Sequence, residues 1–349
     1  MTTDWRQLRE RHDPDDMFGR VERFPEQMDD AWRIGTGFVA DVTVPKPSRV
    51  VVCGMGGSAI GADMAASFLG NHIGVPMTVC RDYTAPGYFR DDSLVIISSY
   101  SGNTAETLSA YESLAGGNST FLAITSGGRL AQLCGRNGVP VCSIPGGMPP
   151  RSALAYSLLP TLLVLRAAGA ADFDDREFAE ARAEVERRCR SCANGSKDNP
   201  AVRIAEDLRG NIPFVYAAQG LLGATARRWA CQFNENSKSL AHFAYYSELN
   251  HNEIVGWNGP AEVMAHAAVV ALEDVDDGDG VARQRDVGLE IIGPLAASVT
   301  RVPSAEGGRL ARMLSSVILG DFASVYLALL DGVDPTPVEK IDYLKSQLL

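Results

Sequence analysis

Long apolar runs and an excess of positive charge are both missing from this sequence of 349 residues. No uninterrupted apolar run approaches the ~20 residues needed to span a bilayer, so we expect no membrane partner. The N-terminal stretch MTTDWRQLRERHDPDD is charged and lacks an apolar centre, which argues against a secretory signal. The net charge is −11, from 32 Lys and Arg against 43 Asp and Glu. Because affinity for a phosphate backbone depends on clustered Lys and Arg, we expect no nucleic-acid partner.

Disulfide frameworks and metal-ligand motifs are absent as well. The seven cysteines are odd in number, and several lie in apolar, strand-like runs. Buried free thiols explain them best, which predicts a reducing, cytoplasmic location. Only five histidines are present, without a His-x-His or HExxH pattern, and His242 and His251 lack a matching cysteine set. Cys189-x-x-Cys192 has no second pair, so we expect no metal.

The sequence does contain enough apolar residues for a substantial core. Hydrophobic residues make up 46% of the chain and charged residues 21%, and the mean hydropathy is −0.04. The length suggests about two domains at roughly 150 residues each. Short apolar runs alternate with helical stretches, a pattern that predicts an α/β fold of parallel sheets covered by helices on both faces. The predicted strands are 49–53, 76–80, 94–100, 120–125, 139–144, 212–219, 265–274 and 297–304.

The charged stretch 172–200 is poor in large apolar residues, and strand and helix patterns lie on both sides of it. We interpret it as an exposed linker helix that separates two α/β domains. The predicted organisation is an N-terminal helical segment (1–42), a first domain (43–170), the linker helix (171–198) and a second domain ending in a C-terminal helix (199–349).

The segment CGMGGSAIGADM (53–64) places four glycines directly after the first strand, at the start of a helix. Glycines let backbone amides approach an anion, and the helix N-terminus adds further N–H donors. Gly54-x-Gly56-x-x-Ala59 fits a relaxed dinucleotide fingerprint, whereas the same loop with Ser58 could hold a monophosphate or a sugar. The third alternative is a tight turn without a ligand. A P-loop is excluded because the Lys-Ser/Thr ending is missing.

The segment SSYSGNTAET (98–107) favours the monophosphate. It also follows an apolar strand, and Ser99, Ser101 and Thr104 supply three hydroxyls at the start of the next helix. One such hydroxyl would be an ordinary helix cap, but three within six residues indicate a phosphate cradle. Ligands of open parallel sheets bind at the carboxyl ends of the strands, where both segments are expected.

Three further residues are candidates for chemistry. Arg151 follows two prolines in GGMPPRSALAY (146–156) and could stabilise an anionic substrate or intermediate. Glu235 in FNENSKSLAHF (233–243) and His251 in ELNHNE could form a general acid/base pair. The alternative for both is a solvated helix end and a polar loop.

Taken together, these motifs form a recognisable set. GMGGSAIG and SYSGNTAET resemble the sugar-isomerase (SIS) domain. With PPRS, NENSK and ELNHNE in this order, residues 15–349 resemble the bifunctional phosphoglucose/phosphomannose isomerase family. The resemblance implies an α/β fold of two SIS domains.

The resemblance also implies roles for individual residues. It assigns substrate phosphate binding to Gly57, Ser58, Ser99, Ser101 and Thr104. It further assigns Arg151 to the enediolate, Glu235 to proton transfer between C1 and C2, and His251 to ring opening. In a homodimer of this family, that histidine comes from the neighbouring subunit. A C-terminal lysine is its partner; Lys345 fits the family pattern better than Lys340.

The implied activity is metal-independent interconversion of glucose 6-phosphate, and of mannose 6-phosphate, with fructose 6-phosphate, without a cofactor. Two other functions are open. A non-catalytic SIS-type sugar-phosphate sensor would keep the serine loop without needing Glu235 or His251. A nicotinamide-dependent enzyme would need an acidic ribose ligand after the second strand, where Arg81-Asp82 is ambiguous.

Overall fold

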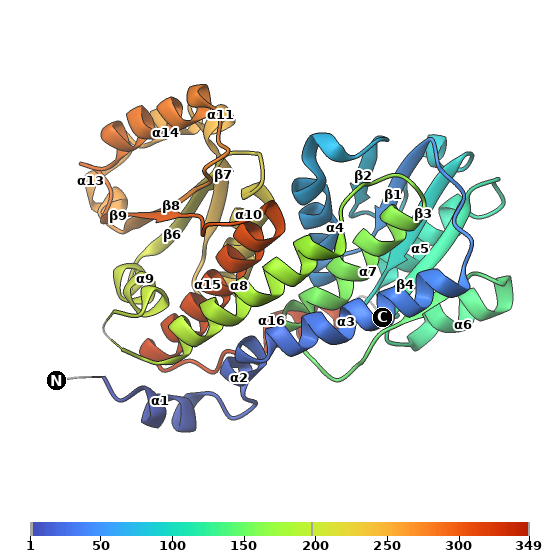
Figure 1. Ribbon diagram of the computed structural model, residues 1–349. Coiled ribbons are helices and arrows are strands. Elements are labelled where there is room, and N and C mark those ends of the chain that lie inside the picture. Colours follow the sequence, from blue (N-terminus) through green and yellow to red (C-terminus); the bar gives the residue numbers. More distant parts are fainter. Residues whose placement is uncertain (1–2, 197, 348–349) are drawn as a thin grey trace. The chain divides into compact units, whose positions relative to one another are not determined.

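The computed structural model describes residues 3–196 and 198–347, and the chain forms two compact units (Figure 1). The first unit is Arg23–Arg182. The second unit combines the residues up to Glu22 with those from Ala183 onward. The division falls inside α8 (Asp175–Ala193). Each unit contains one parallel sheet flanked by helices, so the predicted α/β class is confirmed.

The first unit is built on a five-stranded sheet with the order β2-β1-β3-β4-β5. Its strands are β1 (Arg49–Cys53), β2 (Met77–Cys80), β3 (Ser93–Ser98), β4 (Thr120–Thr125) and β5 (Val141–Ser143). All six residues of the central strand β3 are buried, which is why it reads as one apolar run in the sequence. β1 and β3 are neighbours, with Cys53 opposite Ile97 at their carboxyl ends.

The helices of the first unit cover both faces of this sheet. They are α3 (Phe24–Asp41), α4 (Gly56–Leu69), α5 (Ala105–Leu114), α6 (Gly128–Asn137) and α7 (Leu154–Ala167). Leu108 of α5 and Leu130 of α6 share a core cluster with Val95 of β3. The chain runs from β1 outward to β2 and then back past β1 to β3. Right-handed connections therefore place α4 on the face of the sheet opposite to α5 and α6. The switch point therefore lies between β1 and β3, where ligands of such sheets bind.

The second unit is built on a four-stranded sheet with the order β7-β6-β8-β9. Its strands are β6 (Ile212–Ala217), β7 (His242–Tyr245), β8 (Ala267–Glu273) and β9 (Ser298–Pro303). The helices are α1 (Trp5–His12), α2 (Met17–Glu22), α9 (Pro200–Leu208), α10 (Gly223–Glu235), α11 (Tyr246–Leu249), α12 (Glu253–Gly256), α13 (Ala261–Met264), α14 (Asp279–Ile292), α15 (Arg309–Leu330) and α16 (Glu339–Gln347).

Helices α10 and α11–α14 lie on opposite faces of the second sheet (Figure 1). The chain passes from β6 to its neighbour β7 through α10, then returns across β6 to β8 through α11, α12 and α13. Right-handed connections place these two crossovers on opposite faces. Tyr246, Leu249 and Trp257 accordingly pack with Tyr216 and Val269 in one core cluster.

Helix α15 is long and apolar enough to cross a membrane by length and composition, although Arg312 and Asp321 interrupt its apolar sequence. In the structure 94% of its most apolar stretch is buried inside the chain. It packs against α9 and α10 of its own unit, so it is a core helix of the second unit.

The seven cysteines are free thiols, and six of them are buried. Burial raises the pKa of Cys53 to about 12 and that of Cys134 to about 11, which keeps both protonated at neutral pH. Cys189 and Cys192 lie one turn apart on the buried face of α8. Their spacing therefore reflects helix packing.

Candidate active site

Two loops predicted to bind phosphate lie next to each other at the carboxyl edge of the first sheet. The loop at 54–58 follows β1 and the loop at 99–104 follows its neighbour β3. They are joined directly, because the backbone N–H of Tyr100 donates to Ser58 Oγ over 3.0 Å. Ser58 uses a lone pair in this bond, so its own O–H can still donate to an anion.

Glycine is required at two positions in these loops. A Cβ at Gly57 would lie 2.5 Å from the carbonyl oxygen of Pro150, so only glycine lets the turn before Arg151 approach α4. Gly102 has a φ of +69°, and a Cβ there would lie 1.8 Å from the carbonyl oxygen of Gly127. Both glycines thus serve close backbone approach as well as chain flexibility.

The hydroxyl groups of the second loop are not used as helix caps. Thr104 occupies the N-cap position of α5 without a side-chain capping bond, and its Oγ1 lies 2.9 Å from Ser99 Oγ. Ser99 is 1% exposed, whereas Ser101 is exposed and accepts from the N–H of Asn103. Met55, the N-cap residue of α4, likewise makes no side-chain capping bond. Two uncapped helix N-termini beside buried hydroxyls form a site suited to one phosphate.

Tyr100 and Thr107 were not singled out from the sequence. Besides binding Ser58, Tyr100 accepts from Ser126 Oγ through its carbonyl over 2.7 Å, and its hydroxyl accepts from the N–H of Met148 over 3.0 Å. The Thr107 hydroxyl is buried in the first turn of α5 and has no hydrogen-bond partner among the described residues. Both lie inside the quoted motif, but most of the hydrogen bonds of Tyr100 described here use its backbone, which carries no residue-type signal.

Arg151 lies on the short 3₁₀ helix η3 (Pro150–Ser152) after β5, and is 5% exposed. Gln27 of α3 fixes this segment from both sides. Its Nε2 donates to the Ser152 carbonyl over 2.7 Å, and its Oε1 accepts from the N–H of Ala155 over 3.0 Å. With Pro150 packed on Gly57, the backbone at Arg151 lies beside the glycine loop.

Glu235 is the last residue of α10 and is partly buried. One face of this helix is attached to α15 by buried hydrogen bonds. Arg228 Nη2 lies 2.6 Å from Asp321 Oδ2, and Gln232 Nε2 lies 2.9 Å from Asp321 Oδ1. One turn further, Asn236 Nδ2 donates to Ser324 Oγ over 2.9 Å. The helix end that carries the carboxylate is therefore fixed in place.

His251 is exposed and follows α11, where its N–H donates to the Glu248 carbonyl over 3.0 Å. The segment around it is held by Glu253, whose Oε2 lies 3.0 Å from His242 Nε2 and whose Oε1 accepts from the Tyr216 hydroxyl. Burial, reinforced by Glu253, raises the pKa of Tyr216, so this hydroxyl stays a donor. The four-stranded sheet separates this segment from α10, so the second unit does not bring His251 and Glu235 together.

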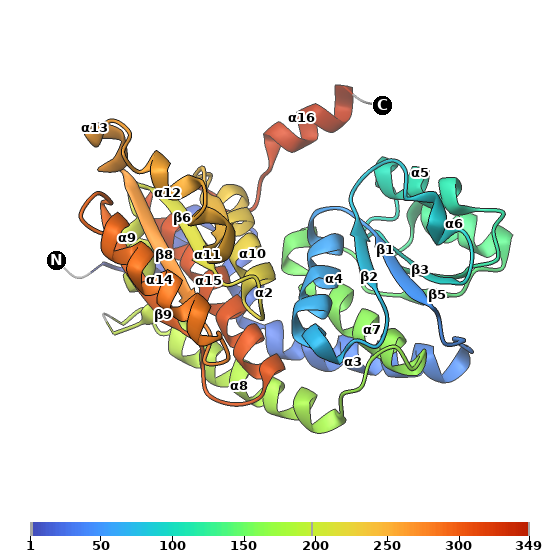
Figure 2. The same cartoon turned by 90° about the horizontal axis from the view of Figure 1, so that it is seen from above.

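Both candidate lysines lie on α16, in which no described residue is buried. Figure 2 shows this helix projecting after the loop that follows α15. The geometry of the second unit does not distinguish Lys345 from Lys340, so the choice of Lys345 stays a prediction.

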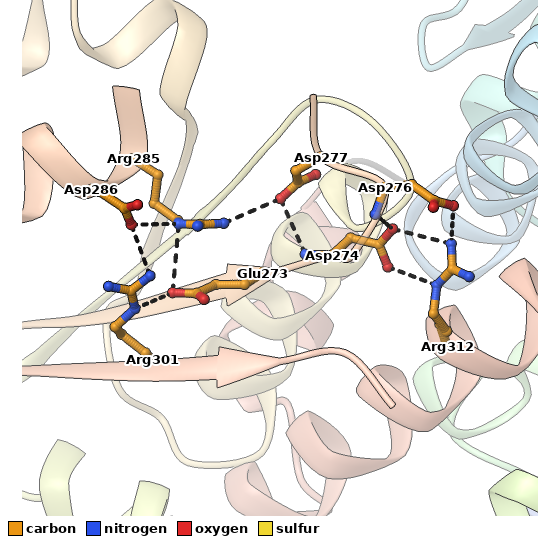
Figure 3. A network of polar contacts seen from close by, with 8 residues as sticks. All are labelled: Glu273, Asp274, Asp276, Asp277, Arg285, Asp286, Arg301 and Arg312. Carbon is orange, nitrogen blue, oxygen red and sulfur yellow. Dashed lines mark hydrogen bonds and ion pairs between the residues drawn. The ribbon is translucent and has the colours of Figure 1, made fainter. Parts of the chain in front are cut away.

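The acidic loop after β8 is neutralised by arginines (Figure 3). Asp274 accepts from Arg312 through both oxygens, at 3.0 and 3.2 Å, and Asp276 pairs with the same guanidinium. Arg285 and Arg301 pair with the carboxylates around them. No group of three or more His, Cys, Asp or Glu residues suited to a metal ion occurs in residues 3–196 and 198–347.

The second half of the chain matches the sequence model of a known domain. Residues 197–348 match the family described as bacterial phospho-glucose isomerase C-terminal SIS domain. Among solved structures, a hypothetical protein from Thermus thermophilus superposes with a TM-score of 0.71 at 18% identity, covering 98% of this chain and 92% of that chain. At this identity the likeness concerns the fold.

Two curated relatives resemble nearly the whole chain. A bifunctional phosphoglucose/phosphomannose isomerase from Caldicellulosiruptor bescii is 39% identical over 335 residues, which covers 95% of this chain and 98% of the relative. A bifunctional phosphoglucose/phosphomannose isomerase from Aquifex aeolicus is 35% identical over 300 residues, covering 86% and 90%.

Proposed function

The chain belongs to the bifunctional phosphoglucose/phosphomannose isomerase family, and we propose that it interconverts glucose 6-phosphate and mannose 6-phosphate with fructose 6-phosphate. The observation that carries the proposal is the pair of adjoining loops after β1 and β3. Gly57, Ser58, Ser99, Ser101 and Thr104 supply amides and hydroxyls for one phosphate. A dinucleotide would not need the second cradle.

Proton transfer is assigned to Glu235. In the opened aldose the carboxylate removes the proton from C2, the C–H electron pair forms the C1–C2 double bond, and the carbonyl electrons move to O1, which gives the enediolate. The same group then returns the proton to C1 while the proton on O2 passes to O1, which leaves the carbonyl at C2 of the ketose. Arg151 stabilises the charge that develops on oxygen. The fixed end of α10 holds the Glu235 carboxylate in one place, where it can act as the base.

Ring opening is assigned to Lys345 and to His251 of the partner subunit in a homodimer. Two observations on one chain support donation of this histidine. His251 is exposed, and it lies on the face of the second sheet opposite to the helix that ends at Glu235. A histidine in this place is accessible to another copy of the chain. The buried free cysteines agree with a cytoplasmic protein.

The test is the rate of fructose 6-phosphate formation from glucose 6-phosphate and from mannose 6-phosphate by the wild-type protein, measured with and without EDTA. We expect activity on both substrates, unchanged by EDTA, because the proposed base and cations belong to the chain. Sugar-phosphate binding without turnover would favour the non-catalytic sensor. Loss of activity with EDTA would contradict the metal-independent mechanism.

A further inference from the structure

Lys238, three residues after Glu235, has a backbone conformation that lysine rarely adopts. Its φ is +55°, in the left-handed region where a Cβ is strained and glycine is the usual residue after a helix end. The chain folds back over the end of α10 here, since the N–H groups of Ser237 and Ser239 both donate to the Phe233 carbonyl. A glycine would make this turn without strain, so the lysine side chain is expected to have a purpose.

That side chain binds backbone carbonyls of two separate segments. Lys238 Nζ lies 2.7 Å from the Glu235 carbonyl oxygen and 3.5 Å from that of Asn236. It also lies 3.2 Å from the carbonyl oxygen of Pro335, which is buried in the loop before α16. An ammonium group has three donors and is favoured beside the carbonyls at the carboxyl end of a helix.

We propose that Lys238 is a positioning residue that fixes the end of α10 at Glu235 and ties to it the loop that leads into α16. The inference rests on the proposed function, because Glu235 and Lys345 matter through their roles in it. The last turn of α10 is already attached to α15 through Asn236 and Ser324. Lys238 extends this attachment to the segment 334–338, from which the helix with both candidate lysines starts.

The two contributions of Lys238 have opposite effects, and this makes the proposal testable. The strained backbone lowers stability, whereas the ammonium orders the loop. Lys238→Gly removes both the backbone strain and the hydrogen bonds of the ammonium to the Glu235 and Pro335 carbonyls. Lys238→Met keeps the strain and loses these hydrogen bonds, and Lys238→Arg keeps a donor group. Asp92→Gly is the matched control, because Asp92 is exposed, has a φ of +53° and lies in the first unit.

The experiment measures the melting temperature, kcat and KM for glucose 6-phosphate, and amide hydrogen exchange of residues 334–347. In Lys238→Gly we expect an equal or higher melting temperature, faster exchange, and a kcat about ten- to hundredfold lower with little change in KM. Lys238→Met should show the same exchange and kcat, and Lys238→Arg should recover most of both. Asp92→Gly should gain stability without change in kcat or exchange.

Unchanged exchange of residues 334–347 in Lys238→Gly and Lys238→Met overturns the proposal, whatever the activity. A kcat that follows the melting temperature across the variants overturns it as well, because Lys238 would then act only on stability. An inactive wild-type protein would refute the proposed function separately, while the exchange rates would still decide whether Lys238 holds the loop.

Discussion

Single residues connect the loops of the candidate site to one another. Tyr100 links the loops after β1, β3, β4 and β5 through its N–H, its carbonyl and its hydroxyl. Serine hydroxyls at a strand end could be predicted as phosphate ligands from their residue types. The role of Tyr100 could not, because backbone bonds between loops depend on the strand order.

Replacing Tyr100 by Phe removes only the hydroxyl that accepts from the N–H of Met148. The backbone bonds that join the two phosphate loops remain, whereas the segment leading to Arg151 loses one attachment. We expect a severalfold lower kcat with a nearly unchanged KM, since misplacing one group that acts in the transition state lowers kcat. Steady-state kinetics with glucose 6-phosphate measure both.

The control for this variant is Tyr111→Phe, which removes a hydroxyl of the same unit that accepts from Asn137 Nδ2 over 2.8 Å. Its kinetics should match those of the wild-type protein. A higher KM with unchanged kcat in Tyr100→Phe would show instead that the hydroxyl supports phosphate binding.

At the scale of elements, buried strands were the easiest to predict. β1 and β3 read as unbroken apolar runs because both faces of each are covered. β7 was not predicted, since its four residues HFAY lie at the edge of the sheet and none is buried. His251, for which a polar loop is the alternative to a catalytic role, lies in a turn between the short helices α11 and α12. Their packing on Tyr216 and Trp257 depends on contacts that no local pattern contains.

The loop between β8 and α14 depends on a buried ion pair. Asp274 and Arg312 have side chains that are 1% and 8% exposed, and they form two hydrogen bonds. Arg312→Met leaves the buried carboxylate without this partner, which should lower the free energy of unfolding by about 3–5 kcal/mol. Urea unfolding measures the change.

Arg190→Met is the matched control, because Arg190 pairs with Glu186 at the exposed surface of α8. Its cost should stay below about 1 kcal/mol. The double variant Asp274→Asn with Arg312→Met should be more stable than Arg312→Met alone, because no buried charge is then left unpaired. Equal free energies of unfolding for Arg312→Met and Arg190→Met would refute the claim that the Asp274–Arg312 pair stabilises the loop.

At the scale of the whole molecule, the residue types indicate a candidate histidine, and only the family resemblance implies that it serves the neighbouring subunit. The subunit that it can serve depends on the order β7-β6-β8-β9, which puts α10 and the His251 segment on opposite faces of one sheet. Strand order is set by long-range packing and is not readable from spacing along the chain. The strand order therefore supports donation of His251 to another subunit in a way that residue types alone could not.

Donation of His251 across a homodimer predicts complementation between two inactive variants. Glu235→Gln and His251→Ala should each be nearly inactive alone. If subunits of the two are mixed and re-paired at random, half of the dimers are mixed, and each mixed dimer has one site with Glu235 and the partner's intact His251. Activity should recover to about a quarter of the wild-type rate. No recovery in a mixture shown to contain mixed dimers would mean that each chain uses its own histidine.

The central claim is that Glu235 transfers the proton of an isomerase reaction, and kcat of Glu235→Gln with glucose 6-phosphate tests it most directly. Glutamine keeps the size and removes the base, so the account predicts a kcat lower by about 10²–10⁴-fold with KM within a few fold of the wild type. A Glu235→Gln variant that forms fructose 6-phosphate at the wild-type rate would contradict the account.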